Sequence, residues 1–291
     1  MNSLPPVIAS WRPLVGHSLV DKRRDLELLE RFHSPSAVEQ WLEGAASCGV
    51  GAVAAIAEPR LLAAAAKRRD LGIEFVPVVP NVMGLVREAT EYGMMGAGFR
   101  LVWRLGPSRL IRIGLSCLPK TRSLLRRDFG AVMSVLWDME LGLFRRFRPR
   151  CVLLHPQITD LALALGNREL FAAFARDMRQ RHGLEPGVAT HNFGRLAEQI
   201  EAWGIDMRLA MTPVNDAGWL MKPTREACER HLMSDRFSVI ADRPGLTPPP
   251  TPAEIAAARR RPAVRSVMVD VADWEEFGQK ADGASYASRH K

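Results

Sequence analysis

The chain has 291 residues and a formal net charge of +8 at pH 7. Hydrophobic residues make up 47% of it and charged residues 25%, which excludes a disordered chain and indicates a globular protein with a full core. No uncharged apolar run reaches the ~18 residues of a membrane span, and no basic-then-apolar leader opens the chain. The four cysteines form no CxxC pair, which argues against a disulfide framework and favours the cytoplasm.

Short apolar runs alternate with amphipathic stretches along most of the chain. The runs predicted as strands occupy residues 7–10 (with 14–15 as a possible continuation), 50–57, 73–79, 152–155, 187–190, 207–211, 237–241 and 264–269. Helices are expected at 35–48, 59–69, 124–147, 168–181, 193–203, 224–232, 253–261 and 274–279. Eight strands, nearly all followed by a helix, predict an α/β fold, the (β/α)8 TIM barrel. The alternative is an open doubly wound sheet, but the sequence has neither GxGxxG nor GxxxxGK[ST].

The alternation breaks once, after the third predicted strand. Residues 82–119 interleave arginines with Phe99, Trp103 and aliphatic side chains, and the net positive charge of the chain lies within residues 82–150. We expect one TIM-barrel domain over residues 1–280, with 82–119 as an apolar-basic helical insertion and 281–291 as a flexible tail.

Because the insertion follows a strand, it is expected at the end of the barrel where the strands finish. There it would form a lid or the wall of a pocket for an apolar or anionic substrate, with Trp103 among the substrate-binding residues. A membrane-surface element and a subunit interface in a homo-oligomer are alternatives, as are helices packed on the barrel with solvated arginines. No nucleic-acid-binding motif accompanies the charge, so nucleic acid is not an expected partner.

Polar residues follow the predicted strands where a parallel barrel gathers its carboxyl ends. His155 and His191 end neighbouring strands, and imidazole titrates near neutrality, as proton transfer requires. We interpret these histidines as catalytic, with Glu58 and Asp242 as their partners, in a lyase or isomerase reaction on a small organic molecule. The alternative roles are hydrogen-bonded structural histidines, and carboxylates in ion pairs with Arg243, Arg12 or Lys22.

Further residues at the strand ends are candidates for binding the substrate. They are Asn81, Asn192, Thr212, Asn215 and Arg243. Asparagine orients polar substrates, but it stabilises loops through local backbone hydrogen bonds equally well. Glu58, Asp242 and Asp270 would suit a divalent metal together with the histidines, but no HxH or HExxH spacing supports a metal site. The exits of the last two strands are acidic and poor in glycine, which argues against a phosphate cradle there.

From Cys151 onward the chain resembles the aldo-keto reductases. The segment CVLLHP is similar to that family's fourth strand, which ends in a histidine, here His155. GLEPGVATHNF is similar to the next strand, with Asn192 and Phe193 as the matching pair, and FSVIADRP and VRSVMVDV take the places of the last two strands. The resemblance implies a TIM barrel and an NADP cofactor.

The tyrosine, lysine and aspartate that this family uses for hydride transfer have no counterpart at the predicted strand ends. The two tyrosines are Tyr92, in the insertion, and Tyr286, in the tail. A diverged NADP-binding oxidoreductase is therefore an alternative to the lyase or isomerase. A second alternative is a non-catalytic barrel that binds a partner or a membrane surface through residues 82–119.

Overall fold

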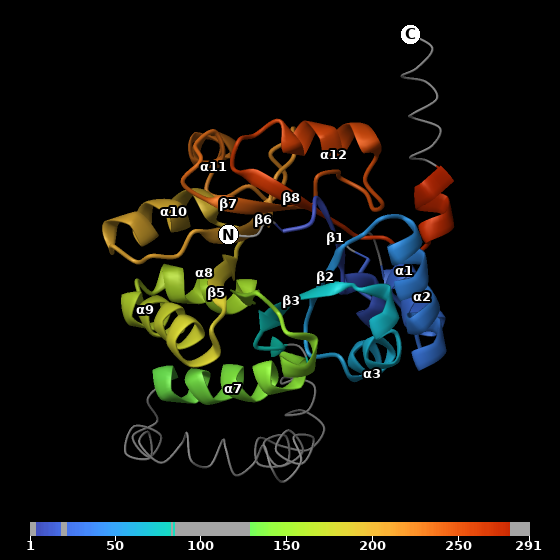
Figure 1. Ribbon diagram of the computed structural model, residues 1–291. Coiled ribbons are helices and arrows are strands. Elements are labelled where there is room, and N and C mark those ends of the chain that lie inside the picture. The colour runs from blue at the N-terminus through green and yellow to red at the C-terminus, as the bar shows by residue number, and fades with distance from the viewer. Residues whose placement is uncertain (1–3, 19–21, 83, 85–128, 280–291) are drawn as a thin grey trace.

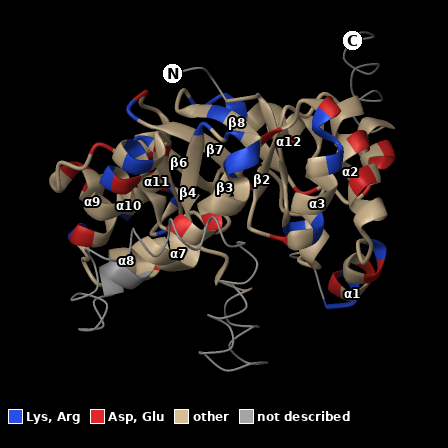
Figure 2. Ribbon diagram, turned by 60° about the horizontal axis from the view of Figure 1, so that its bottom comes forward, with Lys and Arg blue, Asp and Glu red and all other residues tan. Residues whose placement is uncertain are grey.

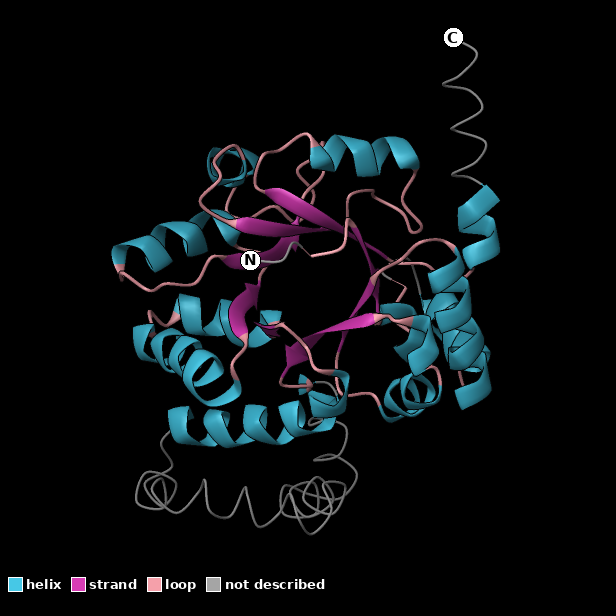
Figure 3. Cartoon of the chain, in the orientation of Figure 1, coloured by secondary structure: helices cyan, strands magenta, loops and turns pink. Residues whose placement is uncertain are grey.

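The computed structural model describes residues 4–18, 22–82, 84 and 129–279. Eight parallel strands close into a barrel in sequence order, and the predicted TIM-barrel fold is thereby confirmed (Figure 3). The strands are β1 (Val7–Ser10), β2 (Ala52–Ala55), β3 (Glu74–Val79), β4 (Cys151–Leu154), β5 (Glu185–Ala189), β6 (Leu209–Pro213), β7 (Ser238–Asp242) and β8 (Val264–Val269). Residues 14–15 do not continue the first strand, because they belong to the 3-10 turn η1 (Arg12–Val15).

Helices surround the barrel (Figure 1). They are α1 (Lys22–Arg31), α2 (Pro35–Ser47), α3 (Pro59–Lys67), α7 (Phe129–Phe144), α8 (Pro156–Ala164), α9 (Arg168–Asp177), α10 (Phe193–Ala202), α11 (Arg225–Leu232) and α12 (Pro252–Arg259), and residues 274–279 are also helical. Short turns of other helix types follow α3, α7 and α9, namely η2 (Arg69–Leu71), η4 (Arg145–Phe147) and η5 (Met178–His182). Two of these helices, α1 and α8, were not predicted.

The alternation of side chains along the strands decides which residues face the barrel interior. Phe75 packs against Phe144 and Phe147, with ring centroids 6.3 and 4.8 Å apart, so its face of the sheet is turned toward the helices. Paired residues of neighbouring strands share a face, and the opposite face therefore lines the interior. At the carboxyl-terminal ends of the strands, the interior positions are those of Ser10, His155, Asp242 and Asp270.

One glycine is required by the packing of this interior. A Cβ atom at Gly187 would lie 2.7 Å from side-chain atoms of Leu153 and of Leu209, its partners on the flanking strands. The two leucines thus fill the volume that a side chain on β5 would need. The polar groups lie above this apolar layer, at the end of the barrel where the strands finish, which we call the mouth.

The predicted insertion at 82–119 lies outside the described residues except for Val82 and Gly84, and the predicted tail at 281–291 lies wholly outside them. Both stay predictions. Within the part of the chain that the structure describes, no helix has the length and apolarity needed to cross a membrane.

Candidate functional site

A buried arginine joins the ends of three strands at the mouth. Arg12, in the turn after β1, is 6% exposed. Its Nη1 donates to Asp242 Oδ2 at 3.1 Å, its Nε donates to Asp270 Oδ1 at 2.9 Å and to Ser10 Oγ at 3.0 Å, and its Nη2 pairs with Asp242 Oδ1. Burial alone would lower the pKa of Arg12, but the charges of Asp242 and Asp270 outweigh it and raise the pKa. The Arg12 guanidinium therefore stays charged across the ordinary pH range.

The same network decides the state of Asp242, a predicted partner of the histidines. Burial would raise the pKa of this carboxyl group, but the charge and hydrogen bonds of Arg12 lower it. Arg243 adds a longer ion pair, from its Nε to Asp242 Oδ2 at 3.7 Å. The carboxylate is thus occupied by arginines, in the ion-pairing role that the sequence left open as its alternative.

The structure brings the two candidate histidines together at the ends of β4 and β5. His155 is buried, and its Nδ1 accepts a hydrogen bond from the Gln157 backbone N–H at 3.3 Å, which caps α8. Burial lowers the pKa of His155 to about 4, and the neighbouring charge of His191 contributes to the shift. His191 is partly exposed, and its Nδ1 lies 3.4 Å from Asp160 Oδ2. His155 is therefore a neutral imidazole near pH 7.

Arg243 and Asn215 lie in the loops that follow β7 and β6, and hydrogen bonds join these two loops. Arg243 has a positive φ of 50°, and its guanidinium lies 5.4 Å from the ring centroid of Trp219. The Asn215 amide donates to the carbonyl oxygens of Trp219 and Arg243, at 3.0 and 3.3 Å, and accepts from the Trp219 N–H at 2.8 Å. The Asn215 side chain thus holds the backbone of these loops, and it positions Arg243.

Two further candidates carry buried oxygen atoms without a hydrogen-bond partner among the described residues: Asn192 Oδ1 and Thr212 Oγ1. Thr212 pairs with Ala241 on the face of the sheet that also carries Phe75, so its side chain lies toward the helix layer. Asn192 follows β5 at the mouth, immediately before α10, but its side chain does not cap that helix. Its side-chain oxygen is a buried acceptor that no described residue pairs.

The remaining candidates serve neighbouring elements. Glu58 caps α3 and pairs with Arg60, with Nε to Oε1 at 2.6 Å, and not with the histidines. The Asn81 side chain accepts from the Gly84 N–H at 2.9 Å, and the backbone N–H of Asn81 donates to Glu140. Trp103 lies outside the described residues. Among those that are described, no three histidine, cysteine or acidic side chains are grouped so that they could hold a metal ion.

An open pocket of about 420 Å³ lies beside the Arg12 network. Its walls come from the loop after β1, from α1 and from the loops after β7 and β8. Arg23, Arg24 and His17 contribute positive or titratable groups, and Pro248 and Pro249 contribute apolar surface. Acidic and basic residues both lie on α1 (Figure 2). Sequence reasoning missed these arginines because it missed α1, whose beginning KRR is the one available signal.

This pocket changes the interpretation of the strand exits. Asp270 lines the pocket, and it made the exit of the last strand look unsuited to phosphate. Arg12 pairs with that carboxylate at 2.9 Å, and together with Arg243 it balances the charges of Asp242 and Asp270. Arg24 pairs with Glu27 at 3.4 Å, whereas the described residues give Arg23 no carboxylate partner. The pocket therefore presents an exposed cation to a ligand.

Comparisons with known proteins identify the fold. No family model matches the sequence, and no curated protein matches it either. Among solved structures, a protein described as an aldo-keto reductase from Pseudomonas aeruginosa aligns with a TM-score of 0.52 and 13% identity, over 96% of this chain and 89% of its own. A thermostable aldo-keto reductase solved with the inhibitor epalrestat aligns with a TM-score of 0.48 and 14% identity, over 97% of this chain and 90% of its own.

These findings confirm the predicted resemblance at the level of fold: the chain is a distant aldo-keto-reductase-like TIM barrel. They also correct the main functional interpretation. A lyase or isomerase is wrong as the leading hypothesis, because the similar barrel is described as a reductase. The described residues agree with the correction, since Arg12 and Arg60 occupy the two carboxylates that were to assist the histidines.

Proposed function

We propose that the protein is an oxidoreductase that binds a nicotinamide dinucleotide at the mouth of its barrel and acts on a small carbonyl compound or alcohol. The observation that carries the proposal is the open pocket between the exits of β1 and β8, lined by Arg23 and His17 beside the neutralised Asp270. Loops at this end of a TIM barrel are a frequent place for phosphate groups. The aldo-keto-reductase-like fold supports the same class of cofactor.

Asn192, at the end of β5, fits the nicotinamide end of such a cofactor. A nicotinamide ring carries a carboxamide, whose nitrogen donates hydrogen bonds. Asn192 Oδ1 is a buried acceptor without a partner among the described residues, and a buried polar atom left unpaired is costly. We infer that this oxygen accepts from the carboxamide, which would orient the ring at the mouth.

The other mouth residues have roles that follow from their contacts. Arg23 would pair with the diphosphate or with a phosphate on the ribose, while the Arg12 network holds the ends of β1, β7 and β8 in place around it. The bound cofactor supplies hydride chemistry. Asn215 and Trp219 hold Arg243 at the rim.

His155 would contact the substrate. Because its Nδ1 accepts a backbone hydrogen bond, the proton of the neutral ring resides on Nε2. With a pKa of about 4, the ring stays neutral at pH 7 and offers this N–H as a hydrogen-bond donor. Its position faces the barrel interior, so the N–H would orient and polarise a carbonyl oxygen at the mouth.

The test is a titration of the full-length protein with NADPH, followed by the fluorescence of the cofactor. We expect saturable binding that weakens with salt, and about tenfold weaker binding for Asn192→Leu, which removes the carboxamide acceptor. Arg23→Gln should weaken binding several-fold. Arg195→Gln, which alters an exposed arginine on α10, is the matched control and should bind like the wild type.

Absence of saturable binding by the wild-type protein would overturn the proposal. So would equal affinities for the wild type, Asn192→Leu and Arg23→Gln, because the cofactor would then bind elsewhere. Thermal melting of each variant separates a loss of binding from a loss of folding.

A further inference from the structure

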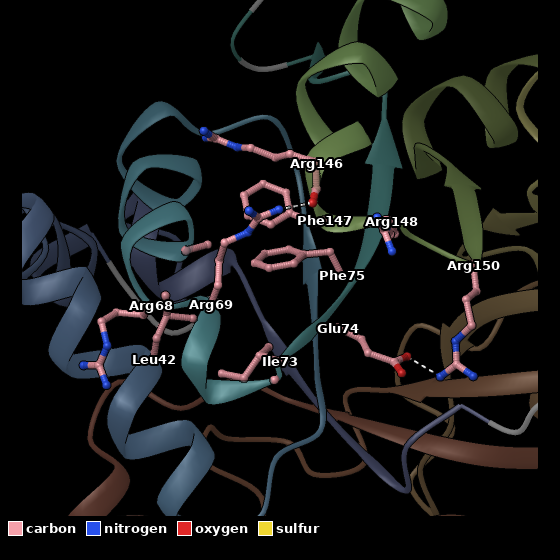
Figure 4. Close-up of a pocket in the computed structure, with 12 residues that line it drawn as sticks. Leu42, Arg68, Arg69, Ile73, Glu74, Phe75, Arg146, Phe147, Arg148 and Arg150 are labelled. Carbon is pink, nitrogen blue, oxygen red and sulfur yellow. Dashed lines mark hydrogen bonds and ion pairs between the residues drawn. The ribbon is translucent and has the colours of Figure 1, made fainter.

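A second pocket lies at the other end of the barrel, where the strands begin. It measures about 440 Å³, within the range of small-molecule sites. Two connections form it: the turn η2 with Gly72, which leads from α3 into β3, and the turn η4 with residues 148–150, which leads from α7 into β4. Figure 4 shows its side chains, among them Glu74, the first residue of β3, and Arg150, which directly precedes β4.

The pocket is strongly basic. Five arginines line it against a single carboxylate, that of Glu74; they are Arg68, Arg69, Arg146, Arg148 and Arg150. Arg150 pairs with Glu74, and Arg68 pairs with Glu43 and with Asp70, the latter at 2.9 Å. These pairs account for the charge of two of the five arginines.

Arg69 and Arg148 are not neutralised by a carboxylate within the described ranges. Arg69 donates to the backbone carbonyl of Arg146 at 2.5 Å, as the dashed line in Figure 4 marks, and a carbonyl does not cancel its charge. The Arg148 side chain makes no hydrogen bond or ion pair with any described residue. Both side chains are exposed, so a ligand can reach them.

The backbone at Arg148 gives it a special position. It ends η4 with a φ of 49°, a left-handed conformation that glycine adopts more readily than arginine. A strained residue of this kind is a reason to ask what its side chain contributes. At this turn, the side chain adds a cation to the pocket wall.

The inner wall of the pocket is aromatic and aliphatic. The rings of Phe75 and Phe147 lie with their centroids 4.8 Å apart, and the Arg146 guanidinium lies 4.9 Å from the centroid of Phe147. Ile73 and Leu42 extend this surface. The wall would accept a flat ring next to the cations, because aromatic and guanidinium groups both stack on planar rings.

We propose that this pocket binds an organic phosphate that carries a planar ring, such as a nucleotide. Arg69 and Arg148 pair with the phosphate groups, and the base lies against Phe147. The site is separate from the mouth, and it does not depend on the function proposed for the mouth.

The experiment is isothermal titration of the full-length protein with ADP at low salt, with pyrophosphate and adenosine as separate probes of the two halves. We expect ADP to bind more tightly than either half. Arg148→Gly, which suits the backbone at this turn, and Arg69→Gln should each weaken ADP binding at least about fivefold. Arg195→Gln on α10 is the control, and it should leave this binding unchanged.

Failure of the wild-type protein to bind ADP overturns the proposal. Binding that Arg148→Gly and Arg69→Gln leave unchanged also overturns it, because the nucleotide then occupies another site. Because Arg148→Gly removes a side chain without straining the turn, a folding defect is not expected to obscure the result. A melting curve of each variant checks this point.

Discussion

Glu140 is a buried carboxyl group without a positively charged partner among the described residues. It is 2% exposed on α7, and its two oxygens accept from the Asn81 N–H at 2.7 and 2.8 Å. Burial raises the pKa of Glu140 to about 8, and this hydrogen bond only partly opposes the shift. Sequence reasoning did not identify it, because a single glutamate within an apolar helix is typical of an ordinary surface position.

The shift predicts a loss of stability with rising pH. In the unfolded chain the carboxyl group releases its proton near pH 4.5, whereas the folded protein keeps it until about pH 8. The free energy of unfolding should therefore fall between these values, by about 1.4 kcal/mol per pKa unit at most. Glu140→Gln should flatten this fall, as measured by urea unfolding at pH 5, 7 and 9. Glu275→Gln, at an exposed position, is the control, and the same slope in both variants would contradict the account.

The lowered pKa of His155 predicts the opposite pH dependence of the free energy of unfolding. Its pKa is lowered from 6.5 to about 4 in the folded protein, so stability is fully present above pH 6.5 and declines as the pH falls toward 4. His155→Asn removes the titrating group and keeps a residue that caps helices well, so it should reduce the decline. His155→Ala also loses the cap of α8, and it should cost about 1 kcal/mol at pH 7. If unfolding curves at pH 4.5 and 7 do not distinguish His155→Asn from His155→Ala, the side chain of His155 does not stabilise α8 as its cap.

At the scale of elements, the Arg12 network connects the first strand to the last two. Arg12→Met would leave Asp242 and Asp270 buried without their main counter-ion. A broken buried ion pair costs about 3–5 kcal/mol, so we expect a large drop in melting temperature. The melting temperature of Arg12→Lys should lie between those of Arg12→Met and the wild type, because one ammonium group cannot pair with both carboxylates as a guanidinium does. Melting of Arg12→Met within a degree or two of the wild type would show that the network does not stabilise the ends of β1, β7 and β8.

The two helices that were not predicted, α1 and α8, were missed for the same physical reason: few of their apolar residues are buried. Only Leu28 is buried on α1, while Leu26 and Leu29 are exposed, so its apolar periodicity is weak. Leu161 on α8 and Leu165 at its C-cap are also exposed, and the helix begins directly after β4. Helices with a regular buried face were predicted within a few residues, as for α10 with its five buried positions.

At the scale of the whole molecule, the order and direction of the strands could be predicted from the sequence, because each strand is a short apolar run buried on both faces. The same rule placed His155, Asp242 and Asn192 at the mouth. It could not give their partners, because these come from elements distant in sequence: Arg12 contacts Asp242 across 230 residues. Nor could it separate Thr212 from the interior positions, which needs the strand register.

The most direct test of the proposed function is a crystal structure of the protein grown with NADPH. We expect the nicotinamide carboxamide within hydrogen-bond distance of Asn192 Oδ1, and the phosphates beside Arg23 between the exits of β1 and β8. Electron density for the cofactor only in the pocket at the opposite end of the barrel, or none at the mouth at saturating concentration, would contradict it.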